Sequence, residues 1–270
     1  MTVNHYENFP VASFLLPRRY RRPVALIYRF AREADDFADE GDLPDAARLA
    51  QLDVFRNELR KIAAGAPPGI SWFESLAELI RNYDLPIDTF NDLLSAFSQD
   101  VTKKRYATYS ELLDYCQRSA NPVGRLLLAI YGSATPRNLA CADAICTGLQ
   151  LVNFLQDIAI DYQKNRIYLP QDEMMRFHIS EQQIAAGDTG GNWKAFMAFQ
   201  TARARELLHA GAPLGRALRG RIGLEMRMIV QGGDRILTKI AAVGGDVYRH
   251  RPLLRPHDWL HMFFRSCFPA

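Results

Sequence analysis

Apolar residues recur along most of the chain at spacings of three and four residues, which is the period of an amphipathic α-helix. The stretches 24–31, 112–119 and 149–156 show this spacing well. Runs that alternate every second residue are short, and no Asn-Gly or Asp-Gly pair separates two of them as in a β-hairpin. The pattern predicts an all-α protein.

Proline and glycine interrupt the helical pattern at intervals typical of helix–loop–helix connections. The predicted breaks are Leu43-Pro44, 64–69, Leu85-Pro86, Thr135-Pro136, Leu169-Pro170 and 187–192. None of them has the length or composition of an interdomain linker, and no repeat of fixed period is present. We therefore expect a single domain over residues 1–270.

The composition is that of a globular protein, with 48% hydrophobic and 23% charged residues in 270. Lys and Arg number 33 against 30 Asp and Glu, so the net charge of +3 does not call for a nucleic-acid partner. No uninterrupted apolar run approaches the ~20 residues of a membrane span, and residues 1–10 do not resemble a signal peptide. Four cysteines fit neither a zinc site nor a disulfide scaffold. These features predict a cytoplasmic protein.

A first acidic cluster has the sequence AREADDFADEGD. Asp35 and Asp39 are four residues apart and share one helix face, with Asp36 one step round it. Tyr28 and Arg32 lie on the same stripe. Taken alone, the cluster is more simply interpreted as a solvated acidic face.

A second polar stripe runs through the segment QLVNFLQDIAIDYQKNRIYLP. It consists of Gln150, Asn153, Asp157 and Asp161, in an otherwise apolar helix. A solvent-exposed stripe usually carries Lys and Glu, whereas this one carries only the amide and carboxylate oxygens that Mg²⁺ prefers.

Two such helices facing each other would hold Mg²⁺ ions around a diphosphate and so assist its departure. Arg166 and Tyr168, just beyond the second stripe, would supply a cation and a hydroxyl to the same phosphate. The two stripes together favour chemistry on a diphosphate.

Three blocks of sequence resemble the squalene and phytoene synthase family: YRFAREADDFAD (28–39), YCQRSANPVG (115–124) and the segment 150–170. The third block is the most specific, because an N-x-x-x-D-x-x-x-D stripe followed by NRIYLP is rarely reached by chance. Similarity covers roughly residues 5 to 255. The segments HYENFPVAS and SANPVGR look most like the hydroxysqualene synthases of the bacterial hopanoid pathway, a branch of this family.

The resemblance implies an isoprenoid synthase fold, an all-helical barrel around a deep apolar cavity with both acidic clusters at its mouth. It implies Mg²⁺ as the cofactor, with Mn²⁺ as the alternative ion. The implied metal ligands are Asp35, Asp36, Asp39, Asn153, Asp157 and Asp161, and the implied catalytic residues are Asp35, Asp39, Asp157, Asp161 and Tyr115. The implied substrate-binding residues are Tyr28, Arg32, Gln150, Asn153, Arg166 and Tyr168.

Two departures and two weaker matches accompany this pattern. Gln156 stands where the family usually has a basic residue, so one basic contact is expected to be missing. His5 and Arg22 match further anion-facing positions. Asn121, where relatives carry Ala-Gly, either positions a water in the cavity or serves, with Pro122, as a structural helix break.

The reaction implied is conversion of presqualene diphosphate and water to hydroxysqualene and diphosphate, by a carbon–oxygen lyase acting on a prenyl diphosphate. The alternative is head-to-head condensation of two farnesyl diphosphates to presqualene diphosphate or squalene, or a phytoene- or dehydrosqualene-type prenyltransferase. No Gly-x-Gly-x-x-Gly loop is present, so no nicotinamide cofactor is expected.

Other classes fit the residues less well. A carboxylate-bridged di-iron bundle needs two Glu-x-x-His pairs, and the chain has only Glu206 with His209. In a non-catalytic helical protein the two acidic stripes would be incidental. Arg203 and Arg205 are assigned to a solvated helix face.

The C-terminal stretch WLHMFFRSCF (259–268) is more apolar than a free tail. It either packs back on the domain or lies on the inner face of the membrane as a peripheral anchor. Other enzymes of the squalene pathway are conceivable partners.

Overall fold

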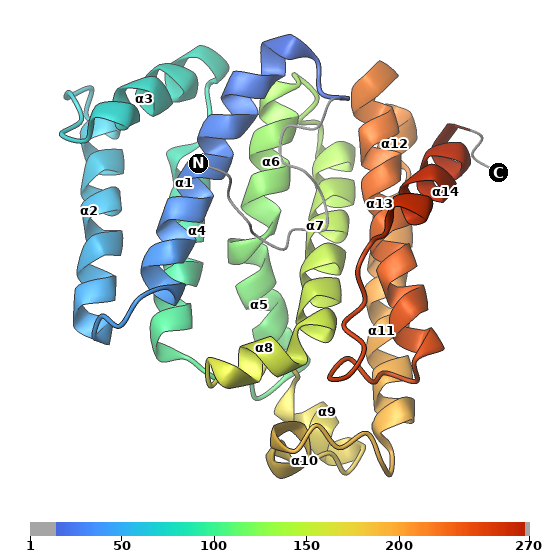
Figure 1. Ribbon diagram of the computed structural model, residues 1–270. Coiled ribbons are helices and arrows are strands. Elements are labelled where there is room, and N and C mark those ends of the chain that lie inside the picture. Colours follow the sequence, from blue (N-terminus) through green and yellow to red (C-terminus); the bar gives the residue numbers. More distant parts are fainter. Residues whose placement is uncertain (1–14, 268–270) are drawn as a thin grey trace.

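The computed structural model describes residues 15–267, and helices make up most of this part of the chain (Figure 1). Within it the β-type pairing is an isolated bridge between Arg105 and Ile167. The all-α prediction is confirmed. The helices are α1 (Arg18–Asp39), α2 (Asp45–Ala63), α3 (Ser71–Tyr83), α4 (Ile87–Thr102), α5 (Tyr109–Ser119), α6 (Asn121–Ile130), α7 (Pro136–Gln156), α8 (Ile158–Gln163), α9 (Gln171–Arg176), α10 (Glu181–Ala185), α11 (Trp193–Gly211), α12 (Leu214–Ala217), α13 (Gly220–Ala242) and α14 (Pro256–Cys267).

The helix boundaries follow the predicted breaks. Pro44, Pro86 and Pro170 directly precede α2, α4 and α9, and Pro136 begins α7, where its missing N–H costs nothing. The hydroxyl of Thr135 caps α7 by accepting a hydrogen bond from the backbone N–H of Asn138. The predicted breaks therefore account for six of the thirteen connections between the described helices.

Two apolar clusters hold the helices together. One lies among α1 to α4, where the rings of Phe30, Phe55, Phe73 and Phe90 pack edge to face or tilted. The other surrounds α7 and α11, which approach closely at Gly211, since a Cβ there would stand 2.5 Å from the carbonyl oxygen of Cys141. α7 thus occupies the centre of the molecule.

Among the described residues, α7 is the one helix long and apolar enough to cross a membrane by length and composition alone. The core helix of a soluble protein passes the same test, and α7 packs extensively against α6 and α11.

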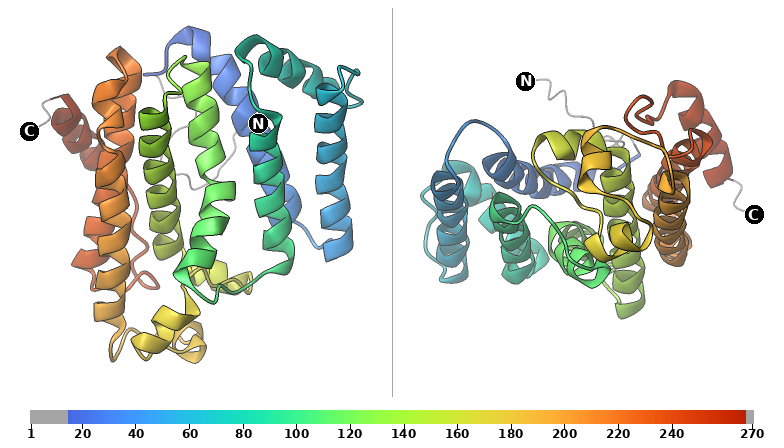
Figure 2. Two further views of the ribbon diagram at one scale, coloured as in Figure 1. Left: turned by 180° about the vertical axis from the view of Figure 1, so that it is seen from behind. Right: turned by 90° about the horizontal axis from the view of Figure 1, so that it is seen from below.

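The ends of α1 and α7 and the short helix α8 meet at one end of the bundle (Figure 1). Viewed from that end, the segment carrying α8 to α10 crosses the ends of the longer helices (Figure 2, right). α7 ends at Gln156, and Asp157, with φ −110° and ψ 16°, turns the chain into α8. The second polar stripe is therefore not one continuous helix, because Asp157 is the turn residue itself and Asp161 lies beyond it in α8.

Candidate active site

An apolar cavity of about 380 Å³ lies between α1, α6, α7 and α13. Its walls are mostly aliphatic, including Val24, Ile27 and Leu149. Three residues predicted to bind substrate, Tyr28, Gln150 and Asn153, also line it. Each polar stripe thus contributes to the cavity wall, whereas the aspartates of both stripes lie further along the chain, outside this lining.

The two acidic clusters are joined directly through Asp39. Its carboxylate accepts hydrogen bonds from the guanidinium of Arg166 and, at 2.9 Å, from Nζ of Lys164. Both cations follow the second cluster in sequence, whereas Asp39 ends the first. Although burial raises the pKa of Asp39, these two cations hold it below its usual value.

The remaining carboxylates of the clusters are crowded. Burial and the charge of Asp39 raise the pKa of Asp35 to about 7, against the opposing effect of Arg32. Burial and the charge of Asp157 raise the pKa of Asp161 well above its usual value, and Asp39 contributes to this rise. The side chains of the two clusters therefore act on one another electrostatically.

Arg32, which also lies on α1, forms ion pairs with the carboxylates of the first cluster. Its guanidinium lies 2.7 Å from the carboxylate of Asp36 and 3.5 Å from that of Asp35. The predicted stripe of Arg32 with these aspartates on one helix face is therefore present in the fold.

Arg251, in the segment after α13, reaches the second cluster. Its Nε lies 2.7 Å from the carboxylate of Asp157. The preceding residue in the cluster, Gln156, is buried and donates a hydrogen bond to the carbonyl of Pro252, which fixes the same segment. The structure thus supplies from a distant segment the basic contact that Gln156 was expected to leave missing, and the sequence analysis did not find Arg251.

A buried carboxylate, Asp100, was also missed. It accepts hydrogen bonds from the hydroxyls of Tyr115 at 2.5 Å and Tyr168 at 2.8 Å, and its backbone carbonyl accepts one from Arg166. Burial raises the pKa of Asp100 to about 6, although Arg166 and the two hydroxyls lower it. No spacing in the sequence marks this residue, because its partners come from α5 and from the segment after α8.

The hydroxyls of Tyr115 and Tyr168 thus have a partner inside the protein that the sequence analysis did not predict. Tyr115 lies in the packed wall beside Asp100 and not among the residues that line the apolar cavity. Tyr168 stacks on Phe154, with ring centroids 4.0 Å apart, and directs its hydroxyl at Asp100. Both tyrosines therefore hold the carboxylate of Asp100 by hydrogen bonds, and the backbone carbonyl of Asp100 in turn holds the guanidinium of Arg166.

Asn121 lies outside the apolar cavity. Its side-chain oxygen accepts a hydrogen bond of 2.9 Å from the hydroxyl of Thr147, and both residues line a separate depression between α6 and α7. Pro122 stands in the first turn of α6, and α5 ends at Ser119, so a helix break is present. This placement corrects the water-positioning hypothesis, and the amide binds Thr147 without capping the helix.

Other expectations have mixed outcomes. Arg203 is not on a solvated face: it pairs with Glu173 and stacks over the ring of Tyr109, 3.5 Å from its centroid. Arg22 is exposed on α1 and reaches Ser75 at 3.5 Å, away from the cavity lining. His5 lies outside the described residues.

The oxygen donors of the two acidic clusters fit Mg²⁺. Its oxygens are hard ligands, and the raised pKa values of Asp35 and Asp161 show carboxylates whose crowding a divalent cation would relieve. Over residues 15–267, no three His, Cys, Asp or Glu side chains form a ready-made cage for one ion. Mg²⁺ usually completes its shell with water and phosphate oxygens, so this arrangement suits an ion that binds together with a diphosphate.

The fold and the site together define a helical synthase of the terpenoid type, in which two polar stripes contribute to an apolar cavity and their acidic clusters are joined through Asp39. The crystal structure of squalene synthase HpnC from Alicyclobacillus acidocaldarius matches with a TM-score of 0.81 and 35% identity, over 89% of this chain and 90% of that one. A dehydrosqualene synthase in complex with a ligand shares the fold, with a TM-score of 0.79 at 22% identity, over 94% of this chain and 88% of that one.

Comparisons of the sequence indicate the same class of enzyme as the fold does. The model of the squalene/phytoene synthase family matches residues 2–258. Hydroxysqualene synthase from Rhodopseudomonas palustris is 36% identical, over 94% of this chain and 85% of its own length. Hydroxysqualene synthase from Sinorhizobium fredii is 32% identical, over 96% of this chain and 87% of its own. The chain is an enzyme that belongs to the squalene/phytoene synthase family.

Proposed function

We propose that the enzyme converts presqualene diphosphate and water to hydroxysqualene and diphosphate, with Mg²⁺ or Mn²⁺ as its cofactor. The observation that carries this proposal is the joining of both acidic clusters at the apolar cavity through Asp39, Lys164 and Arg166. The relatives at 36% and 32% identity are hydroxysqualene synthases, which supports the choice of reaction.

The metal would be held by Asp35, Asp36, Asp39, Asn153, Asp157 and Asp161, and it would neutralise the charge of the departing diphosphate. The chain's own cations complement this function. Arg32, Arg166 and Arg251 now contact carboxylates of the clusters, and each guanidinium has the fork of donors that suits phosphate oxygens. They would bind the diphosphate and keep it at the mouth of the cavity.

The aliphatic walls of the cavity would enclose the prenyl chains and exclude bulk water from the cation formed on ionisation. Product specificity then depends on admitting one water to one carbon. Tyr28 and Gln150 are two of the polar side chains in this mostly apolar lining, and they are the residues we assign to the region where capture occurs.

Head-to-head condensation of two farnesyl diphosphates, to presqualene diphosphate or squalene, is the second candidate. The solved relative at 35% identity is described as a squalene synthase, and condensation would use the same acidic clusters. We place it second because the sequence relatives at 36% and 32% identity are hydroxysqualene synthases.

Separate incubations distinguish the two candidates. Purified enzyme is given presqualene diphosphate or farnesyl diphosphate, each with and without Mg²⁺ and without a nicotinamide nucleotide. The proposal predicts hydroxysqualene from presqualene diphosphate in the presence of Mg²⁺. Turnover of farnesyl diphosphate alone, with presqualene diphosphate left unchanged, would replace the proposal with the condensation reaction.

A further inference from the structure

The C-terminal helix α14 turns apolar side chains away from the protein. Leu260, Phe263 and Phe264 are 63%, 42% and 61% exposed, and their spacing of three and four residues places them on one stripe. The buried residues of α14 are Asp258, Met262 and Ser266, at intervals of four. The helix is therefore amphipathic with its aromatic face outward, the opposite of a core-packed helix.

A buried ion pair fixes this orientation. Asp258 is fully buried and accepts hydrogen bonds from Arg235, at 2.7 Å, and from Lys239, both on α13. A charge so enclosed is costly to leave without its partners, so α14 is held with Asp258 inward. The stripe of Leu260, Phe263 and Phe264 must then face outward.

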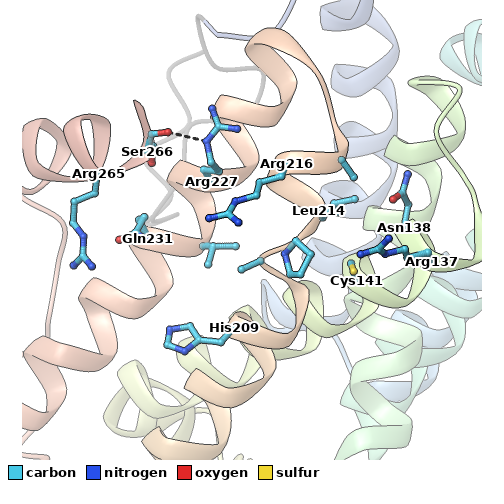
Figure 3. A pocket seen from close by; sticks show the side chains of 14 residues that line it. Arg137, Asn138, Cys141, His209, Leu214, Arg216, Arg227, Gln231, Arg265 and Ser266 are labelled. Atoms are coloured by element: carbon cyan, nitrogen blue, oxygen red, sulfur yellow. Dashed lines mark hydrogen bonds between the residues drawn. The ribbon is translucent and has the colours of Figure 1, made fainter. Parts of the chain in front are cut away.

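A basic cavity of about 950 Å³ adjoins the C-terminal end of α14 (Figure 3). Four arginines from four helices line it, and its lining contains no carboxylate: Arg137 of α7, Arg216 of α12, Arg227 of α13 and Arg265 of α14. The stripe and the cavity share α14: Arg265, in the cavity lining, directly follows Phe264 and points about 100° round the helix axis from it.

Two details indicate that the cavity suits an anion. The guanidinium of Arg227 donates to the backbone carbonyls of Ser266, at 2.8 Å, and Gly215, at 2.5 Å, which leave its positive charge unneutralised. The hydroxyl of Ser266 is buried in the cavity lining and, among the described residues, has no hydrogen-bond partner. A phosphate oxygen would satisfy both groups.

The cavity is distant from the aspartates. α7 begins at Pro136, beside Arg137 in the cavity lining, and ends next to Asp157. At 1.5 Å per residue, its 21 residues separate the two places by about 30 Å. The basic cavity is thus a feature separate from the candidate active site.

We propose that the stripe of α14 and the basic cavity together dock the enzyme on a bilayer of anionic phospholipid. Leu260, Phe263 and Phe264 enter the boundary between headgroups and acyl chains, and the cavity receives a lipid phosphate. Charge selects this occupant over a second copy of the chain, since a two-fold interface through this surface would set the same arginines against each other. The proposal does not depend on which reaction the enzyme catalyses.

Vesicle sedimentation tests the proposal with full-length protein. Vesicles are made of phosphatidylcholine alone or of phosphatidylcholine mixed with phosphatidylglycerol. We expect binding about tenfold tighter to the anionic vesicles, and weaker as salt rises. Absence of binding to the anionic vesicles would overturn the proposal.

Paired variants separate the two parts of the surface. Leu260→Ser with Phe264→Ser should abolish binding to both vesicles, whereas Arg137→Gln with Arg265→Gln should remove only the preference for phosphatidylglycerol. Met175→Ser, at a site 74% exposed on α9, and Arg81→Gln, exposed on α3, are the matched controls and should bind as the parent protein does. Equal binding by the stripe variant and the parent would contradict the docking surface.

A probe on Cys267 gives a second readout that needs no variant. Cys267 is exposed and lies on the stripe, three residues after Phe264, whereas the other three cysteines are buried or half-buried. An environment-sensitive fluorophore there should shift to shorter wavelength with anionic vesicles and not with inorganic phosphate. A shift caused equally by inorganic phosphate, or by a rise in protein concentration with formation of a dimer, would assign the surface to a free anion or to a second copy and overturn the proposal.

Discussion

The guanidinium of Arg166 donates a hydrogen bond to the carboxylate of Asp39, across 127 residues of sequence. Asp39 closes the first acidic cluster at the end of α1, and Arg166 follows the second cluster after α8. Arg166 also donates to the backbone carbonyl of Asp100, which the hydroxyls of Tyr115 and Tyr168 hold in place. Arg166 thus links the first acidic cluster, the segment after the second cluster and the buried residue Asp100.

Asp157→Ala and Asp161→Ala should each lower kcat by at least about 100-fold, because each removes a carboxylate that the proposed reaction uses to hold its cation. Neither side chain belongs to the two apolar clusters that hold the helices together, so the helical circular dichroism spectrum should stay close to that of the parent. Asp53→Ala, in an ion pair of α2 with 60% exposure, is the control and should keep full turnover. Turnover within about threefold of the parent in either site variant would contradict the proposed function.

The stability of the metal-free protein should fall as the pH rises from about 4 to 7. Asp35, with a pKa raised to about 7, keeps in the folded state a proton that the unfolded chain releases at lower pH. Asp100 and Asp161 are shifted in the same direction. Asp35→Asn should flatten this slope in thermal unfolding measured in chelator between pH 5 and 8, and an unchanged slope would argue against the crowding of Asp35.

Mg²⁺ and diphosphate should act together on the thermal stability of the protein. At pH 8, which is above the raised pKa of about 7 of Asp35, Mg²⁺ with inorganic diphosphate should raise the melting temperature more than either does alone. Asp161→Asn is expected to lose most of this rise, whereas Asp53→Asn should keep it. Equal shifts from Mg²⁺ alone and from the combination would contradict joint binding.

Tyr115→Phe should destabilise the protein by about 1.5–3 kcal/mol, because it removes a hydrogen bond to a buried carboxylate. It should also raise the pKa of Asp100, whose ionised form that hydroxyl stabilises. Tyr106 is buried in the same group of rings but contacts Gln99, so Tyr106→Phe is the matched control, with a smaller loss of about 1 kcal/mol. Urea unfolding measures both, and equal losses would show that Asp100 has no special role.

Arg251→Gln should lower kcat/KM by about tenfold, through loss of a cation beside the diphosphate. The same change frees Asp157 from its ion pair, so the concentration of Mg²⁺ needed for half-maximal rate should fall. Arg249→Gln, at a side chain 66% exposed and paired with Asp246, is the neighbouring control. A higher Mg²⁺ requirement in Arg251→Gln would show that the guanidinium assists metal binding and does not compete with it.

Sequence sufficed for the features that depend on local spacing. The helical period predicted the all-α class, prolines and glycines marked six of the connections between helices, and the stripe of Tyr28 and Arg32 with Asp35 lies on one face of α1 as predicted. The turn at Asp157 was not predicted. It consists of a change in the backbone angles of one residue, and the helical spacing of the polar stripe continues through it.

Long-range contacts account for the rest of the difference. Asp100 and Arg251 were missed because their partners are brought near only by tertiary packing, Asp157 being 94 residues away from Arg251. Tyr115 and Asn121 were assigned to the cavity from the resemblance and from residue chemistry. Their sequence positions could not show that one faces Asp100 and the other Thr147.

Reaction of presqualene diphosphate in ¹⁸O-labelled water is the most direct test of the central claim. The products of enzyme with Mg²⁺ are separated and their mass is measured, with Asp161→Ala as the inactive control. We predict hydroxysqualene that carries one ¹⁸O in its hydroxyl group. Unlabelled alcohol, or a hydrocarbon as the only product, would contradict capture of the cation by water.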